Sequence, residues 1–129
     1  MEYAMGLRSI RNLDYTVIAC ADLHATRDFY RDVMHFPIDE ERKNWVQFRV
    51  GGAILALRPR PEAAGAAVPC TDLQLAFRVP PAEITACHAE LIAAGVTITR
   101  GPLDLPSWRH QAFFFRDPEG TLIEIYAEY

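Results

Sequence analysis

The chain has 129 residues, a formal net charge of −4 and a hydrophobic fraction of 50%. This length is close to the commonest size of a single domain, and the composition supplies enough apolar side chains for a sizeable core. The mild acidity, with no basic cluster larger than residues 58–60, argues against nucleic acid as the main partner. No apolar stretch is long enough for a secretory signal or a membrane span, so the sequence predicts a cytoplasmic protein with no membrane partner.

The three cysteines argue against a disulfide framework. Cys20, Cys70 and Cys87 are odd in number and far apart, and no two of them form the close pair typical of a zinc knuckle. Because free cysteine is usually buried and inert, Cys20 and Cys87 are predicted to be small core residues.

The first half of the chain is predicted to form a strand, a helix and three further strands. Residues 13–20 are apolar and partly β-branched, which indicates a strand. Asp22 is a favourable helix N-cap, and the apolar residues after it recur at helical spacing. Residues 44–50 and 53–57 alternate as strands do, and the two glycines between them signal a hairpin.

The second half repeats this order after residues 58–69, a predicted linker rich in proline, alanine and glycine. Its predicted elements are a strand at 73–79, a helix closed by Gly95, a short strand at 96–99, a loop at 101–107 and a hairpin of 110–116 and 121–126. The repeat predicts an α+β fold, a single domain over residues 1–129 built from two tandem βαβββ modules at about 10–58 and 71–128. Each helix would cover one face of a mixed sheet that curls around a cleft on its other face.

The most informative stretch is the last one, residues 115–126. Pro118 and Gly120 predict a tight turn, and the strand after it alternates in polarity. Glu124 places one carboxylate among the apolar residues of this strand. Burying an ionised carboxylate costs free energy unless it meets water, a cation or hydrogen-bond donors, so Glu124 is predicted to face a wet pocket or groove.

Several segments together resemble the vicinal oxygen chelate superfamily. They are the opening strand at 13–18, the Asp-Leu pair at 22–23, the helix with Phe-Tyr at 29–36, the second-half strand at 74–79 and the closing turn and strand at 115–124. The resemblance covers residues 10–128. That superfamily includes glyoxalase I, extradiol dioxygenases, fosfomycin-resistance transferases and bleomycin-binding proteins, so the resemblance implies a shared fold more firmly than a reaction.

The resemblance also implies a divalent metal held by four symmetry-related strands, at the positions of Tyr15, Ala56, Gln74 and Glu124. Glu124 matches the carboxylate ligand of the family, but Tyr15 and Gln74 stand where the family offers histidine. One carboxylate with an amide and a phenol is a poor ligand set for zinc-like ions. The sequence therefore predicts no cofactor; the alternative is a divalent metal on Glu124, with Gln74 and Tyr15 as weaker ligands.

Strand parity adds Arg58, Arg78 and Tyr126 to the same inward faces, because alternate residues of a strand share a face. The two arginines either hold a carboxylate or phosphate of a ligand or form surface salt bridges. Trp45 and Trp108 lie near strand or loop ends, where an aromatic side chain either closes a pocket or packs in a core or dimer interface.

Three functions remain as alternatives. The favoured one is a metal-independent protein that binds a small organic molecule, as the resemblance to bleomycin-resistance proteins implies. The second is a metal-dependent lyase or dioxygenase of the glyoxalase type. The third is a metal-free acid/base enzyme in which Glu124 moves a proton, assisted by Tyr15 or by His110, which adjoins a strand expected to border the cleft. Exposed sheet edges and the resemblance both predict a homodimer.

Overall fold

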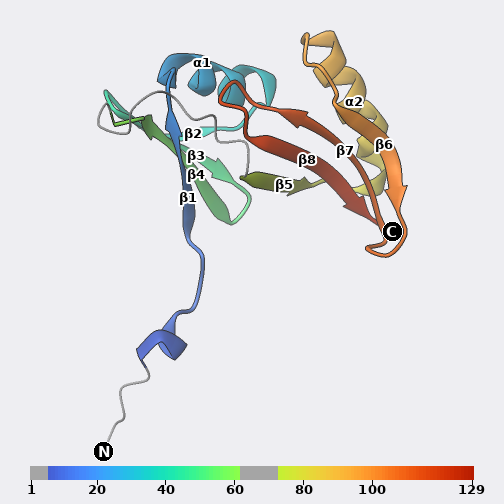
Figure 1. Cartoon of the computed structure of the whole chain (residues 1–129), viewed down its shortest axis with the longest axis horizontal. Coiled ribbons are helices and arrows are strands. Elements are labelled where there is room, and N and C mark those ends of the chain that lie inside the picture. The colour runs from blue at the N-terminus through green and yellow to red at the C-terminus, as the bar shows by residue number, and fades with distance from the viewer. Residues whose placement is uncertain (1–5, 62–72) are drawn as a thin grey trace, which may run out of the picture.

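A computed structural model describes residues 6–61 and 73–129 (Figure 1). The first module contains η1 (Gly6–Ser9), β1 (Tyr15–Cys20), α1 (Leu23–Asp28), the π-helical turn η2 (Phe29–Val33), β2 (Ile38–Arg42), β3 (Trp45–Val50) and β4 (Ala53–Pro59). The second contains β5 (Gln74–Arg78), η4 (Pro81–Glu83), α2 (Ile84–Ala93), β6 (Arg100–Leu105), β7 (His110–Arg116) and β8 (Leu122–Glu128). The order βαβββ occurs twice, which confirms the predicted α+β fold. Most of the predicted linker, and Cys70, lie outside the described residues.

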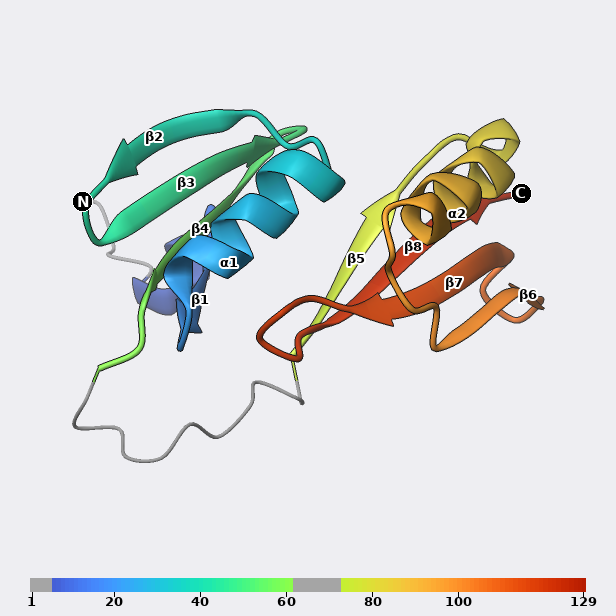
Figure 2. The ribbon, with the colours of Figure 1, turned by 90° about the horizontal axis from the view of Figure 1, so that it is seen from above.

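Each module forms one mixed sheet of four strands, ordered β1-β4-β3-β2 in the first and β5-β8-β7-β6 in the second. The first and last strands of each module pair in parallel, and the other pairs are antiparallel. Figure 2 shows the two sheets beside each other, and across the described residues they do not join into one. The strands β1, β2, β5 and β6 are therefore all edge strands.

Two strands lie where the sequence analysis located none. β2 is a charged run, Ile38–Arg42, without an alternating apolar pattern. β6 covers Arg100–Leu105, so the prediction of a strand at 96–99 followed by a loop at 101–107 was wrong. Both are edge strands, which tolerate charged residues and proline because one side of such a strand needs no ladder hydrogen bonds.

The core lies between the sheets and their helices. In the second sheet, Phe113 and Phe115 of β7 and Ile123 of β8 are fully buried on the face that α2 covers. His88 of α2 packs edge-on against Phe113, with ring centroids 5.3 Å apart. The alternate residues of β7 and β8 point to the opposite face of the sheet. None of the described helices is long and apolar enough to cross a membrane.

A cluster of buried polar side chains links the two modules, and we call Tyr30, Arg60, Asp117 and Glu119 the joint. The Tyr30 hydroxyl donates a hydrogen bond of 2.6 Å to Asp117, which also accepts from two backbone N–H groups of its own turn. Glu119 accepts hydrogen bonds of 2.8 and 3.1 Å from the two backbone N–H groups that precede α1, and a third of 3.3 Å from Arg60. The turn between β7 and β8 thereby fixes the second sheet against the first module.

The burial of Cys20 and Tyr30 predicts a loss of stability at high pH. Cys20 is 1% exposed, which confirms it as a core residue, and burial raises the pKa of its thiol from 9.0 to about 12. Burial, together with the nearby Asp117 carboxylate, raises the pKa of Tyr30 well above its ordinary value. The unfolded chain therefore releases these protons at lower pH than the folded chain, so the free energy of unfolding should fall as pH rises from 9.0 toward about 12.

Urea unfolding at about pH 8, 9.5 and 10.5 measures this effect. Cys20→Ala removes one of the two groups, so the variant should lose less stability than the parent between the first and last pH. Equal losses in the two proteins would show that the Cys20 thiol does not contribute.

Candidate functional site

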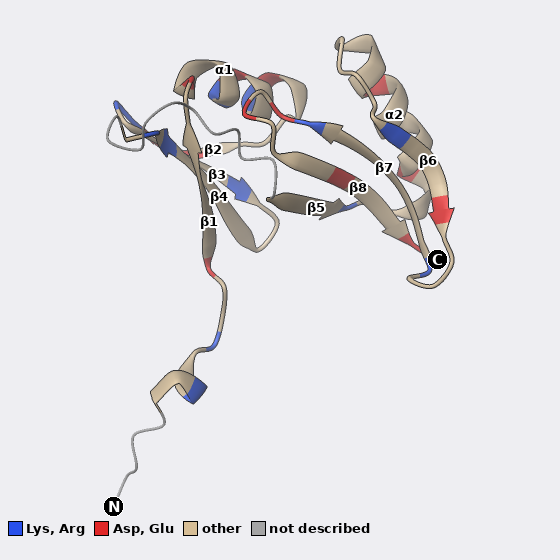
Figure 3. Cartoon of the chain, in the orientation of Figure 1, with Lys and Arg blue, Asp and Glu red and all other residues tan. Residues whose placement is uncertain are grey.

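Glu124 belongs to a row of paired residues that crosses the second sheet. It pairs with Ala76 of β5 on one side and with Phe114 of β7 on the other, and Phe114 pairs in turn with Arg100 of β6. Paired residues share a face of a sheet, so all four side chains lie on the face opposite α2. Figure 3 shows an acidic segment part-way along β8, the strand that carries Glu124. We call Glu124, Phe114 and Arg100 the charged row.

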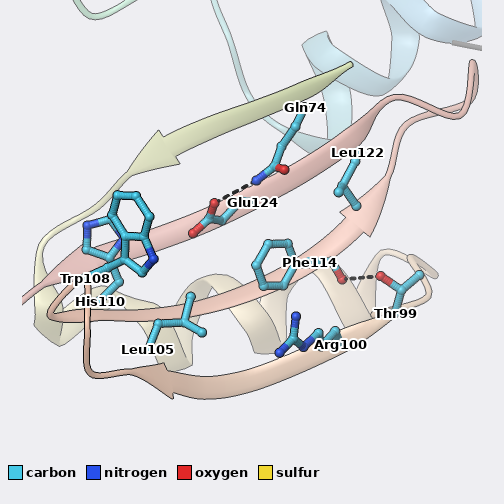
Figure 4. Close-up of a pocket in the computed structure, with 9 residues that line it drawn as sticks. All are labelled: Gln74, Thr99, Arg100, Leu105, Trp108, His110, Phe114, Leu122 and Glu124. Atoms are coloured by element: carbon cyan, nitrogen blue, oxygen red, sulfur yellow. Dashed lines mark hydrogen bonds between the residues drawn. The ribbon is translucent and has the colours of Figure 1, made fainter. Parts of the chain in front are cut away.

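This face of the second sheet is hollowed into a pocket of about 680 Å³ (Figure 4). Its lining consists of Gln74, Thr99, Arg100, Leu105, Trp108, His110, Phe114, Leu122 and Glu124. Glu124 is only 8% exposed, and its carboxylate accepts a hydrogen bond of 3.0 Å from the Gln74 side-chain amide. Across residues 6–61 and 73–129, no other side chain donates to this carboxylate. The pocket thus combines apolar walls with one nearly buried carboxylate, as small-molecule sites commonly do.

Aromatic rings form one end of the pocket. His110 stacks on Tyr126 with ring centroids 4.3 Å apart, and Trp108 lies 6.3 Å from His110. The Trp108 side chain is 71% exposed, whereas His110 is mostly buried. An exposed indole at the mouth of a pocket offers a flat apolar surface to a ligand.

The pocket brings together four residues that the sequence singled out, Gln74, Trp108, His110 and Glu124. Tyr126 adjoins them through its stacking on His110. Arg78 lies further along β5, where it forms an exposed ion pair of 3.7 Å with Glu128.

The remaining candidates, Tyr15, Trp45 and Arg58, belong to the first sheet. The register of β1 with β4 places Tyr15, Ala56 and Arg58 on one face of that sheet, as strand parity predicts. Trp45 shares the sheet and donates a hydrogen bond of 3.0 Å to Gln47. Within one chain, the pocket around Glu124 takes its lining from the second module alone.

Phe114 and Arg100 are pocket residues that the sequence analysis missed. Strand parity could have predicted that Phe114 faces the pocket, because Phe114 lies four residues from His110 and therefore on the same face of β7. Parity could not be applied to Arg100, because the glycine and proline that follow it are atypical of a strand and β6 was therefore not predicted.

Gly101 shapes the strand that presents Arg100. Its φ is +88°, and a Cβ there would lie 2.7 Å from the backbone oxygen of Ala112. Gly101→Ala should therefore lower the free energy of unfolding by about 1–3 kcal/mol. Gly52→Ala is the matched control, because a Cβ at Gly52 would meet no atom within 4 Å. Urea unfolding compares the two variants, and equal midpoints would contradict the prediction.

Comparison with known proteins identifies the family. A family model described as the Glyoxalase/Bleomycin resistance protein/Dioxygenase superfamily matches residues 12–125. The chain belongs to this superfamily. The match runs from just before β1 into β8, so it includes both modules and confirms the resemblance stated from the sequence.

Several known proteins resemble the chain along most of its length. It is 24% identical over 118 residues to the metallothiol transferase FosB of Shouchella clausii, covering 91% of this chain and 80% of the relative. It is 25% identical over 123 residues to the virulence protein STM3117 of Salmonella typhimurium, whose crystal structure superposes with a TM-score of 0.72 over 93% of this chain and 98% of that one. A glyoxalase/dioxygenase from Nostoc punctiforme superposes with a TM-score of 0.79 at 20% identity, over 100% of this chain and 99% of that one. The last likeness shows the fold alone.

A superfamily metal would lie at Glu124, but the side chains at the matching positions do not fit one. Ala56 has no donor atom, and the phenol of Tyr15 is a poor ligand for a zinc-like ion. Gln74 directs its amide N–H group, and not an oxygen, toward the Glu124 carboxylate. Within the described part of the chain, no three His, Cys, Asp or Glu side chains gather closely enough to hold a metal ion.

Proposed function

We propose that this protein binds a small organic molecule in the pocket of the second sheet, without a metal at Glu124. The observation that carries the proposal is the setting of Glu124, a carboxylate 8% exposed that faces a pocket of about 680 Å³ and accepts from one neutral amide. A carboxylate with so few donors is stabilised when a ligand brings an N–H group or a positive charge to it. The exposed Trp108 ring and the Phe114 ring supply apolar contact for the rest of such a ligand.

A second copy of the chain completes the proposed site. Residues 6–14 extend away from the body of the protein (Figure 1), and Leu7, Ile10 and Leu13 in this arm are 85%, 70% and 87% exposed. The arm leads into β1, where Tyr15 is 57% exposed. Neighbouring exposed apolar side chains mark an interaction surface, and a symmetric pair of chains would bury them. We expect a homodimer in which the first module of one copy faces the pocket of the other.

The homodimer predicts a light-scattering mass of twice 14.6 kDa at micromolar concentration. Replacing Leu7, Ile10 and Leu13 together with serine should shift the mass toward 14.6 kDa, because the apolar contact of the arm is lost. Ile92→Ser is the control, since Ile92 is another large apolar residue, 52% exposed, on α2. A parent protein that is monomeric, or a triple variant that stays dimeric, would contradict the role of the arm.

Binding at the pocket is tested with the neutral probe benzyl alcohol, in buffer containing EDTA. Backbone amide NMR shifts should change along β6, β7 and β8, with millimolar affinity as expected for so small a molecule. Trp108→Ala should weaken binding several-fold, whereas Ile92→Ala, on the exposed side of α2, should leave it unchanged. Shift changes confined to the first sheet, or none anywhere, would overturn the proposal.

A second candidate function is metal-free acid/base catalysis. Glu124 and His110 line the same pocket, so a bound molecule would lie within reach of two groups that can exchange protons. Under this alternative, Glu124→Gln would abolish turnover of a substrate while leaving the unfolding midpoint unchanged. Retained turnover in a folded Glu124→Gln variant would exclude it.

A further inference from the structure

The pocket holds two opposite charges at the ends of the charged row. Glu124 on β8 and Arg100 on β6 are separated by one strand, β7, which places Phe114 between them. Adjacent strands are about 4.8 Å apart, so the Cα atoms of the two charged residues are roughly 10 Å apart across the sheet. Figure 4 shows the Phe114 ring between the carboxylate and the guanidinium, with all three side chains facing the pocket.

The negative end of the row is poorly compensated. Glu124 is more than nine-tenths buried, and the Gln74 amide supplies one hydrogen bond to a carboxylate that accepts up to four. A neutral amide does not balance the charge of a carboxylate removed from water. An ammonium group of a ligand would supply both the charge and the missing donors.

The positive end is also available to a ligand. The Arg100 guanidinium lies 5.7 Å from the centroid of the Phe114 ring, and within residues 6–61 and 73–129 no carboxylate approaches it to salt-bridge distance. Its five N–H donors match a carboxylate or phosphate in paired geometry. The ring beneath it holds the guanidinium over the pocket by cation–π attraction.

We infer that the ligand of this pocket is a zwitterion with a flat apolar body, whose ammonium group binds Glu124 and whose carboxylate or phosphate binds Arg100. The body of the ligand lies over Phe114 and against Trp108. A molecule with one charge leaves one end of the row unpaired, and a neutral molecule leaves both, so charge arrangement sets specificity. This inference rests on the proposed function, since it names the chemical class bound at the same pocket.

Four probes of similar size test the inference at neutral pH and low salt with EDTA present. They are 4-(aminomethyl)benzoate, which is zwitterionic, benzylamine, benzoate and benzyl alcohol. NMR titration of the parent protein should give an affinity for the zwitterion about tenfold or more above that for each of the other three, equivalent to about 1.4 kcal/mol. Glu124→Gln should reduce the zwitterion to the affinity of benzoate, and Arg100→Gln should reduce it to that of benzylamine. Arg31→Gln, which removes a positive charge from η2 and not from a sheet face, should change nothing.

The outcomes separate the inference from the function on which it rests. If all four probes bind the second sheet within about threefold of one another, the pocket binds small molecules but the zwitterion inference is wrong. If benzyl alcohol and the charged probes all fail to shift the residues of β6, β7 and β8, both fail. Because the four probes are compared on the parent protein, a variant that misfolds does not remove the test.

Discussion

Glu119→Ala is expected to lower the free energy of unfolding by about 3–5 kcal/mol. The Glu119 side chain is 4% exposed, and it binds two backbone N–H groups ahead of α1 and the Arg60 guanidinium. Removing the carboxylate leaves a mostly buried guanidinium without its charge partner and two donors without an acceptor, and such breaks are among the costliest single changes.

Urea unfolding measures the Glu119 effect directly. Glu90→Ala is the matched control, because Glu90 lies on α2 with an exposed side chain and, among the described residues, forms an ion pair only with His35 on the surface. The control should stay within about 0.5 kcal/mol of the parent. A Glu119 variant as stable as the control would show that the joint does not hold the modules together.

Tyr30→Ala should destabilise the protein by a similar amount, about 3–5 kcal/mol. Tyr30 is fully buried, and its ring packs against Phe36 and Phe48 at 6.0 Å and against Phe29 at 5.2 Å. The alanine variant loses this packing and the hydrogen bond to Asp117 together.

Tyr30→Phe separates the two contributions, because it keeps the ring and removes only the hydroxyl. Asp117 retains its two backbone donors in that variant, so the loss should be about 1–3 kcal/mol. Chemical unfolding of both variants gives the comparison. If Tyr30→Phe costs as much as Tyr30→Ala, the hydrogen bond and not the packing carries the effect, contrary to this expectation.

Much of the candidate site could be predicted because strand parity is a local property. The alternation around Glu124 and Gln74 requires only that each segment be a strand, and both side chains do face one pocket. Strand parity also predicted correctly that Tyr15, Ala56 and Arg58 share a face of the first sheet. Parity does not say which two sheet faces meet, because that depends on packing between modules that are distant in sequence.

The positive end of the charged row could not be predicted for a different reason. Local preference disfavours Gly101 and Pro102 in a strand, but the sheet edge at β6 requires hydrogen bonds on one side only. The register shift between Arg100 and Leu103 accommodates the glycine and proline between them, so Arg100 still pairs with Phe114. The pairing of β6 with β7 thus outweighs the local preference of Gly101 and Pro102 against a strand. For this reason the sequence alone did not predict that Arg100 lines the pocket.

Superfamily membership sets the fold of this protein but leaves its chemistry to the side chains of the pocket. Its relatives include proteins named as a transferase and as a virulence protein, at 24% and 25% identity. In this chain, Gln74 donates a hydrogen bond to the carboxylate, and the first sheet has Tyr15 and Ala56 at the other two matching positions. These substitutions favour recognition of an organic ligand by Glu124 over coordination of a metal.

We propose that the Glu124 pocket holds an organic molecule and not a metal ion. Native mass spectrometry of protein expressed with zinc, manganese and iron supplied distinguishes the two occupants. We expect a dimer of 14.6 kDa chains without stoichiometric metal, which takes up one 4-(aminomethyl)benzoate per chain and loses that uptake on Glu124→Gln substitution. A dimer that carries one metal ion per chain, released by Glu124→Gln, would contradict the claim and make Glu124 a metal ligand.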